Sequence, residues 1–159
     1  MSESAPLKLT RLTVLPEWID YNGHMNVAFY VLAFDKAVDV LFNTIGIGAD
    51  YLKSHNASSF SLQIHINYLQ EVAEGDELEF YARIMDYDHK RMHIYMEMHQ
   101  VNQGYLAATM EQMGMHIDME KRRSAPFPAH ITENIQSLFE VHKDCPSPKW
   151  AGRQIAIPR

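Results

Sequence analysis

The chain has 159 residues, of which 47% are hydrophobic and 21% are charged, and this composition is typical of one globular domain and excludes a mainly disordered chain. Its 20 acidic and 14 basic residues give a net charge of −6, which disfavours nucleic acid or an anionic membrane surface as the main partner, because both attract a basic face. A single cysteine, Cys145, excludes an intramolecular disulfide and a multi-cysteine zinc site. With no signal-peptide pattern and no apolar run of about 18 residues, the sequence predicts a soluble cytoplasmic protein.

The first half of the chain is expected to form one strand and one long helix. Residues 7–15 are a short apolar-rich run that stops at Pro16, which is typical of a strand. The segment 18–26 contains the turn dipeptide Asn-Gly. From Val27 to Ile45 the apolar residues follow helical spacing over most of the circumference, which predicts a helix that other structure must cover.

The second half is expected to form a sheet and a short helix. After a loop over residues 50–59, four runs alternate apolar and polar residues with a period of two, as half-buried strands do. In the last run, 105–119, the apolar positions change phase, which predicts a β-bulge near Glu111 and Gln112. A short amphipathic helix and an extended tail follow over 129–159. One antiparallel sheet wrapped around one long apolar helix would bury that helix, so the expected fold class is α+β.

The segment before the long helix is the best candidate for a functional site. Asp20 precedes the helix start, and His24 follows it by four residues. A helix start presents unpaired backbone N–H groups and a partial positive charge, which can hold a thioester carbonyl and stabilise the oxyanion formed on attack. A nearby carboxylate can then act as nucleophile or general base. The alternative is that Asp20, Asn22 and Gly23 are ordinary turn and capping residues.

Several strings in the sequence resemble one enzyme family. Asp-X-X-X-His-X-Asn ahead of an apolar helix, with Asn67-Tyr68-Leu69 and Gly75-Asp76 downstream, resembles the hot-dog thioesterases of the 4-hydroxybenzoyl-CoA type. The strings PEWIDYNGHM, DHKRMH and ATMEQMGMHID are similar to betainyl-CoA thioesterases and to the thioesterase module fused to L-carnitine dehydrogenases. The resemblance implies a single hot-dog domain over residues 1–159, with its core at residues 7–128, that needs neither a metal nor a redox cofactor.

The resemblance also implies roles for individual residues. The catalytic carboxylate of the family falls on Asp20, the main-chain donor to the thioester oxygen falls at Val27, and His24 matches the histidine of the Gly-His-Val-Asn variant. Trp18 stands where the commoner Asp-X-Asp pattern has its first aspartate, so no second acid is expected there. The residues expected to contact the substrate are Trp18, Tyr21, Asn26, Tyr30, His65, Tyr68, Glu111 and Gln112.

Basic residues away from this segment are candidates for the coenzyme A half of a substrate. Lys90, Arg91 and Arg122 are expected to meet its phosphates, and exposed turn charge is the alternative. The other candidates have structural alternatives too. His65 lies on the polar face of its strand, Glu111 and Gln112 suit a buried network, and the aromatic residues suit the core.

Together these features predict an acyl-CoA thioesterase that works as a homodimer or tetramer with the active site shared between two copies. The closer resemblance predicts a short acyl group that ends in a trimethylammonium, as in betainyl-CoA, because aromatic faces bind quaternary ammonium groups. The alternatives are a thioesterase for other short-chain or aromatic acyl groups and a non-catalytic acyl-CoA-binding regulator. A hot-dog dehydratase is disfavoured because its His-X-X-X-X-Pro-Gly spacing is absent from the sequence.

Overall fold

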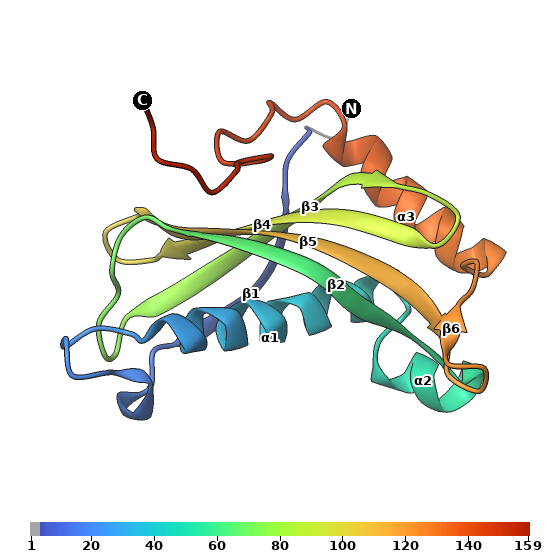
Figure 1. The fold of residues 1–159 in the computed structure, drawn as a ribbon, viewed down its shortest axis with the longest axis horizontal. Coiled ribbons are helices and arrows are strands. Elements are labelled where there is room, and N and C mark those ends of the chain that lie inside the picture. Colours follow the sequence, from blue (N-terminus) through green and yellow to red (C-terminus); the bar gives the residue numbers. More distant parts are fainter. Residues whose placement is uncertain (1–3) are drawn as a thin grey trace.

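The structure is a computed structural model that describes residues 4–159. An antiparallel sheet curls over the long helix α1, while α3 and the C-terminal tail lie on the opposite face of the sheet (Figure 1). The elements in chain order are β1 (Leu7–Thr13), the 3-10 helix η1 (Pro16–Trp18), α1 (Val27–Ile45), α2 (Ala49–His55), β2 (Ala57–Tyr68), β3 (Glu77–Tyr87), β4 (Arg91–Gln100), β5 (Leu106–Asp118), β6 (Arg123–Ser124) and α3 (Ala129–His142).

The sheet has the strand order β1-β3-β4-β5-β2, and the short β6 pairs with β5. All neighbouring strands run antiparallel, so the predicted α+β arrangement of one sheet around one helix is confirmed. Within residues 4–159, β2 pairs only with β5, which leaves its other edge unpaired along a strand of 12 residues. An unpaired edge of this length is a template for pairing with another chain.

Helix α1 forms where the sequence predicts it, because both ends carry capping residues. The Asn26 side chain accepts a hydrogen bond from the Ala28 amide, which satisfies one of the free amides of the first turn. Gly46 ends the helix at φ +97°, a left-handed conformation that glycine adopts without steric cost. One face of the helix then enters the core through Ala33, Phe34, Ala37, Val38, Leu41 and Ile45.

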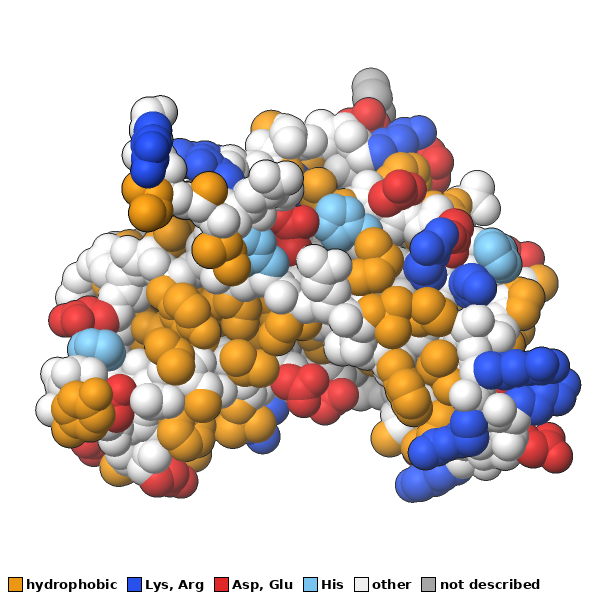
Figure 2. Space-filling model, in the orientation of Figure 1, with side chains coloured by type: hydrophobic (Ala, Val, Ile, Leu, Met, Phe, Trp, Pro, Cys, Tyr) orange, Lys and Arg blue, Asp and Glu red, His pale blue; other side chains and the backbone are white. Residues whose placement is uncertain are grey.

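The other face of α1 remains open and continues onto β2. Val27, Val31 and Leu32 on α1 are 58%, 37% and 38% exposed, and Phe60 and Leu62 on β2 are 42% and 53% exposed. Figure 2 shows this as a broad group of hydrophobic side chains on the face where α1 and β2 lie next to each other. One copy of the chain therefore covers only part of the helix that the sequence predicts to be wrapped.

The predicted bulge lies on a different strand. Glu111 and Gln112 stay in register with β4, and the extra residue is Leu62 of β2, between Ser61 and Gln63. The apolar positions of β5 change phase for another reason: Gln112 is polar but is buried, where its amide donates to the Ser61 hydroxyl at 2.8 Å. A hydrogen-bonded polar side chain can occupy a buried position that an apolar residue would otherwise fill.

One further difference lies before and at the start of β2. Residues 50–59, predicted as a loop, hold most of α2 and the start of β2. The amphipathic helix is confirmed as α3, with Ile131 and Ile135 buried, and residues 143–159 follow it without helix or strand. Among residues 4–159, none of the helices combines the length and apolarity needed to cross a bilayer.

Candidate active site

A tight hairpin over residues 19–26, here called the Asp20 loop, leads into α1. The Asp20 amide donates to the His24 carbonyl at 3.2 Å, and the Gly23 amide donates back to the Asp20 carbonyl at 3.0 Å. Gly23 has φ +81°, so the turn needs a residue that tolerates the left-handed region at this position. The Met25 amide donates to the Val72 carbonyl at 3.0 Å, which anchors the loop on the segment after β2.

The Asp20 carboxylate is held in place by two donors. Its Oδ1 accepts from the Asn22 backbone amide at 2.8 Å, and its Oδ2 accepts from Nδ2 of Asn26 at 3.0 Å. Both hydrogen bonds stabilise the charged form and so lower the pKa of Asp20 below its ordinary value. The bond from the Asn22 amide has the larger effect, and the bond from Asn26 comes second. Asp20 is therefore an ionised carboxylate with a fixed orientation at neutral pH.

The start of α1 offers a free backbone donor next to this carboxylate. The Ala28 amide donates to Oδ1 of Asn26 and the Phe29 amide donates to the Asn26 carbonyl, each at 3.0 Å. Within residues 4–159, the Val27 amide has no such acceptor. An unpaired amide at the positive end of a helix suits a carbonyl oxygen that gains negative charge. This geometry fits the oxyanion role that the family resemblance implies for Val27.

His24 faces an acidic residue, Glu71, that the sequence pattern does not indicate as part of the site. Its Nε2 lies 3.6 Å from Oε2 of Glu71, and its Nδ1 lies 3.3 Å from the Met25 carbonyl oxygen. Glu71 belongs to the segment between β2 and β3, which reaches the Asp20 loop through the hydrogen bond from Met25 to Val72. No spacing in the sequence signals this approach, because it depends on packing between distant segments.

The aromatic candidates separate into buried and accessible residues. Trp18 is 5% exposed and stacks on Phe29 with 5.8 Å between ring centroids, and Tyr30 is 4% exposed. Burial raises the pKa of Tyr30 to about 12, so its hydroxyl stays protonated at neutral pH. Tyr68 is 48% exposed and its hydroxyl donates to the Val27 carbonyl at 3.4 Å, which puts an accessible ring beside the helix start. Tyr21 is 97% exposed on the Asp20 loop.

The remaining polar candidates of β2 and β5 line two different cavities. His65 and Glu111 line one that also contacts residues of the C-terminal tail, and there Glu111 pairs with His93 at 2.8 Å and accepts from the Gly152 amide. Gln112 contacts this cavity too, but it also lines a second one together with α1. Among residues 4–159, no hydrogen bond or salt bridge joins His65 or Glu111 to the Asp20 loop, and the structure does not bring all predicted site residues into one cluster.

Comparison with known proteins identifies the family. A model of the thioesterase-like superfamily matches residues 14–135. The chain belongs to this superfamily. It is 39% identical over 145 residues to the betainyl-CoA thioesterase of Pseudomonas aeruginosa, with 91% of each chain covered. It is also 31% identical over 159 residues to the L-carnitine dehydrogenase/betainyl-CoA thioesterase of Rhizobium meliloti, of which it spans 32%.

A solved structure extends this likeness to the whole fold. SAV2348 of Staphylococcus aureus, solved in complex with CoA, is similar with a TM-score of 0.90 and 30% identity over 99% of this chain and 100% of that chain. The predicted family resemblance is thus confirmed. This member of the superfamily is an acyl-CoA thioesterase with a hot-dog fold.

In this thioesterase the predicted phosphate-binding residues lie far from Asp20 in the same chain. Lys90, whose Nζ lies 3.2 Å from the Ser124 hydroxyl, and Arg122 belong to the end of the sheet at β6. That end and the start of α1 are at opposite ends of the molecule (Figure 1), and basic side chains gather at the β6 end (Figure 2). Arg91 is already paired, because its Nε and Nη2 donate to Oδ2 of Asp88 at 2.8 and 2.6 Å.

Proposed function

We propose that this thioesterase hydrolyses CoA thioesters of a short acyl group that carries a quaternary ammonium, such as betainyl-CoA, with Asp20 as the catalytic carboxylate. The observation that carries the proposal is the ionised Asp20 carboxylate, which Asn26 links to the start of α1, where the Val27 amide is unpaired. The relative of 39% identity, named a betainyl-CoA thioesterase, supports the acyl group.

In this mechanism the two groups act on one thioester. The Val27 amide donates to the carbonyl oxygen and stabilises its negative charge after attack. Asp20 either attacks the carbonyl carbon, forming an anhydride that water then hydrolyses, or removes a proton from the water that attacks. In both routes the carbon–sulfur bond breaks, coenzyme A leaves as a thiol after it gains a proton, and the free acid remains. We assign His24, on the same loop, to proton transfer near the leaving sulfur.

The accessible aromatic rings support a cationic acyl group. Tyr68 lies beside the helix start and Tyr21 is exposed on the Asp20 loop. The face of an aromatic ring attracts a quaternary ammonium by about 0.5–2 kcal/mol, depending on desolvation. Trp18 and Tyr30 act differently, because they are buried and support the loop and the helix from the core.

The test of the reaction is thiol release from a panel of acyl-CoA thioesters by the wild type and by Asp20→Asn. Losing the nucleophile or base should lower kcat by at least about 10²-fold. Asp76→Asn is the matched control, because Asp76 also accepts one backbone amide, from Ala73 at 2.8 Å, and one side-chain amide, from Gln100 at 3.1 Å. A folded Asp20→Asn protein with wild-type activity would remove Asp20 from the mechanism.

The test of the acyl group compares betainyl-CoA with 3,3-dimethylbutyryl-CoA, its neutral isostere. A charge-specific site should favour the cation by about tenfold or more in kcat/KM, which corresponds to about 1.4 kcal/mol. Equal hydrolysis of the neutral thioester would leave the thioesterase activity in place and reject the quaternary ammonium. The release of thiol from an aromatic thioester at a higher kcat/KM would point to the alternative acyl class.

The arrangement of the chain also supports an active site shared by two copies. β2 has an unpaired edge and exposed apolar side chains, so a second copy can pair with it. In a two-fold antiparallel pair, the Ala57 end of one β2 lies beside the Tyr68 end of the other. The β6 end of one copy, with Lys90 and Arg122, then approaches the Asp20 loop of its partner. Dimerisation therefore offers phosphate contacts that the single chain holds too far away.

A further inference from the structure

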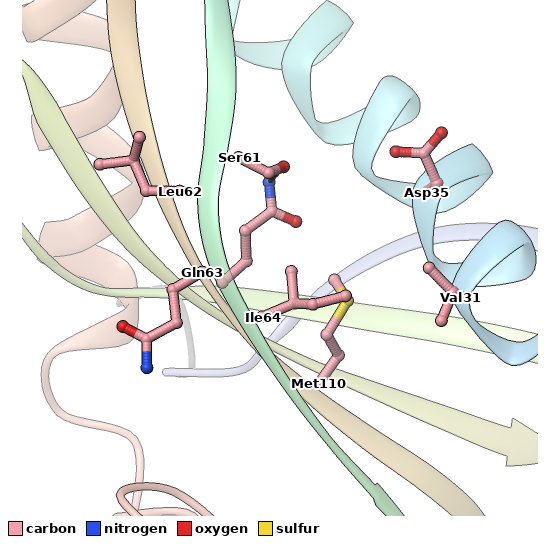
Figure 3. Close-up of a pocket in the computed structure, with 8 residues that line it drawn as sticks. Val31, Asp35, Ser61, Leu62, Gln63, Ile64 and Met110 are labelled. Atoms are coloured by element: carbon pink, nitrogen blue, oxygen red, sulfur yellow. Dashed lines mark hydrogen bonds between the residues drawn. The ribbon is translucent and has the colours of Figure 1, made fainter. Parts of the chain in front are cut away.

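A cavity of about 280 Å³ lies between α1 and the paired strands β2 and β5, at the sheet edge that β2 forms. Figure 3 shows Val31 and Asp35 on α1 facing Ile64 and Met110 across the cavity, with Ser61 and Leu62 further along β2. Four of the eight lining residues are apolar, and Ser61, Gln63 and Gln112 are polar without charge. Asp35 is the one charged residue of the lining, so the cavity combines apolar contact surface with a single negative charge.

The Asp35 carboxylate has no protein partner in residues 4–159, where neither a salt bridge nor a hydrogen bond reaches it. Gln112 and Ser61 of the lining differ from Asp35, since the Gln112 amide donates to the Ser61 hydroxyl at 2.8 Å. Desolvation by neighbouring groups, and secondarily the charge of Asp39, raise the pKa of Asp35 above its ordinary value. Asp35 is exposed to solvent in the single chain, so its carboxylate is free to meet a charged group that enters the cavity.

The cavity is also in line with the thioester position. Val27, Val31 and Asp35 are four residues apart on α1, so they share one face of the helix. Each step is a rise of about 6 Å, and helical side chains lean towards the N-terminus, which brings the Asp35 carboxylate back over the turn of Val31. An acyl group that leaves the Val27 amide along this face therefore enters the cavity with its far end towards Asp35.

Resting on the proposed function, we propose that this cavity receives the acyl group and that Asp35 is the residue that selects a cationic one. The apolar side chains contact the methyl groups of a trimethylammonium, which has no N–H to donate and needs no hydrogen-bond acceptor. The Asp35 carboxylate compensates the charge of the ammonium, and this attraction is stronger where water is excluded. A second copy paired with β2 would cover the open side of the cavity and lower the local dielectric further.

The test measures binding separately from catalysis. In an Asp20→Asn background, which slows turnover, calorimetry gives the Kd of betainyl-CoA and of 3,3-dimethylbutyryl-CoA. Adding Asp35→Asn should weaken betainyl-CoA by about tenfold or more and change the neutral thioester by less than about twofold. Asp39→Asn is the matched control, because Asp39 is the next acidic residue on α1 and does not line the cavity; its charge still acts at Asp35, so it should weaken betainyl-CoA slightly and far less than Asp35→Asn does.

The outcomes separate this proposal from the proposed function. If Asp35→Asn weakens the binding of both thioesters equally, or of neither, the assignment of Asp35 is overturned. It is also overturned if the variant loses self-association and this loss alone explains the weaker binding. Charge-specific binding that depends on Asp35 supports the assignment even if the wild type releases no thiol. In that case the hydrolytic proposal fails and the cation-binding cavity stands. A second readout, kcat/KM of the Asp35→Asn single variant, should fall for betainyl-CoA alone.

Discussion

Asn26 connects the candidate catalytic carboxylate to the helix start, and substitutions can separate these two contacts. Its Oδ1 accepts from the Ala28 amide and its Nδ2 donates to Oδ2 of Asp20, each at 3.0 Å. Asn26→Ser keeps a capping oxygen but loses the longer amide that reaches the carboxylate. Asn26→Ala removes both contacts. The pair therefore distinguishes a residue that positions Asp20 from one that only caps α1.

The expected magnitudes differ for stability and for catalysis. Serine and asparagine cap helices about equally, so Asn26→Ser should change the free energy of unfolding by only a few tenths of a kcal/mol. Asn26→Ala should cost about 1 kcal/mol, which lowers the Tm of a chain of this size by about 2–4 °C. Both variants should lower kcat by about 10- to 100-fold with little change in KM, because a misplacement of about 1 Å at a reacting group costs about 10²-fold.

The pH dependence supplies a readout that capping alone would not move. The hydrogen bond from Asn26 helps to lower the pKa of Asp20, so its loss raises that pKa. Activity needs the ionised carboxylate and falls as pH drops through the pKa of the folded protein. The acid limb of kcat/KM should therefore move to higher pH in Asn26→Ser. The lowered pKa of Asp20 also stabilises the fold at pH values above the ordinary pKa of the carboxyl. This contribution is lost as pH falls through the pKa of Asp20 in the folded protein.

The assay combines thermal unfolding with pH profiles of thiol release. Asn134→Ser is the matched control, because the Asn134 amide donates to the Ile45 carbonyl at 2.8 Å at the other end of α1. This control should lower the Tm without moving kcat or the acid limb. If Asn26→Ser keeps the wild-type kcat and pH profile, Asn26 is only a cap and the reasoning is wrong.

Other predictions follow from the proposed pairing and from the basic end of the sheet. Leu62→Glu should give a monomer in light scattering where the wild type gives a dimer or larger species, and a fully active monomeric wild type would contradict the pairing. Arg122→Ala should raise the KM for acyl-CoA and weaken the salt dependence of this KM. Arg91→Ala should change both quantities little, because Asp88 already pairs with Arg91. A larger effect of Arg91→Ala than of Arg122→Ala would reject this assignment. Mixed dimers of Asp20→Asn and Arg122→Ala chains should be more active than either parent dimer, since one of their two sites combines an intact Asp20 with an intact Arg122. Activity no higher than that of the parents would argue against a shared site.

Features that depend on neighbouring residues were predictable from the sequence. The helix Val27–Ile45 is confirmed because its periodicity and its capping residues act within a few residues of each other. The same holds for the alternation of β3 and β4, whose buried faces follow the period of two. The turn at Asn22 and Gly23 and the position of Asp20 before the helix are local as well.

Features that depend on pairing between distant segments were not predictable from the sequence. The phase change in β5 suggested a bulge at Glu111 and Gln112, but the extra residue is Leu62 on the paired strand. The apolar pattern of β5 changes because the buried Gln112, with a hydrogen-bond partner, stands where an apolar side chain was expected. Family resemblance, and not the residue pattern alone, indicated the thioesterase, since one aspartate before a helix is also an ordinary turn residue.

The sequence by itself thus determined the helix, the strands, the Asp20 loop and the family, all of which depend on local spacing or on matched strings. Only the tertiary structure decided that Glu71 faces His24, that Asp35 borders an apolar cavity and that the basic residues lie at the opposite end of the sheet. The physical reason is that burial, unpaired charge and an open strand edge are properties of packed surfaces. Residues far apart in the chain create those surfaces together, and no short stretch of sequence contains them.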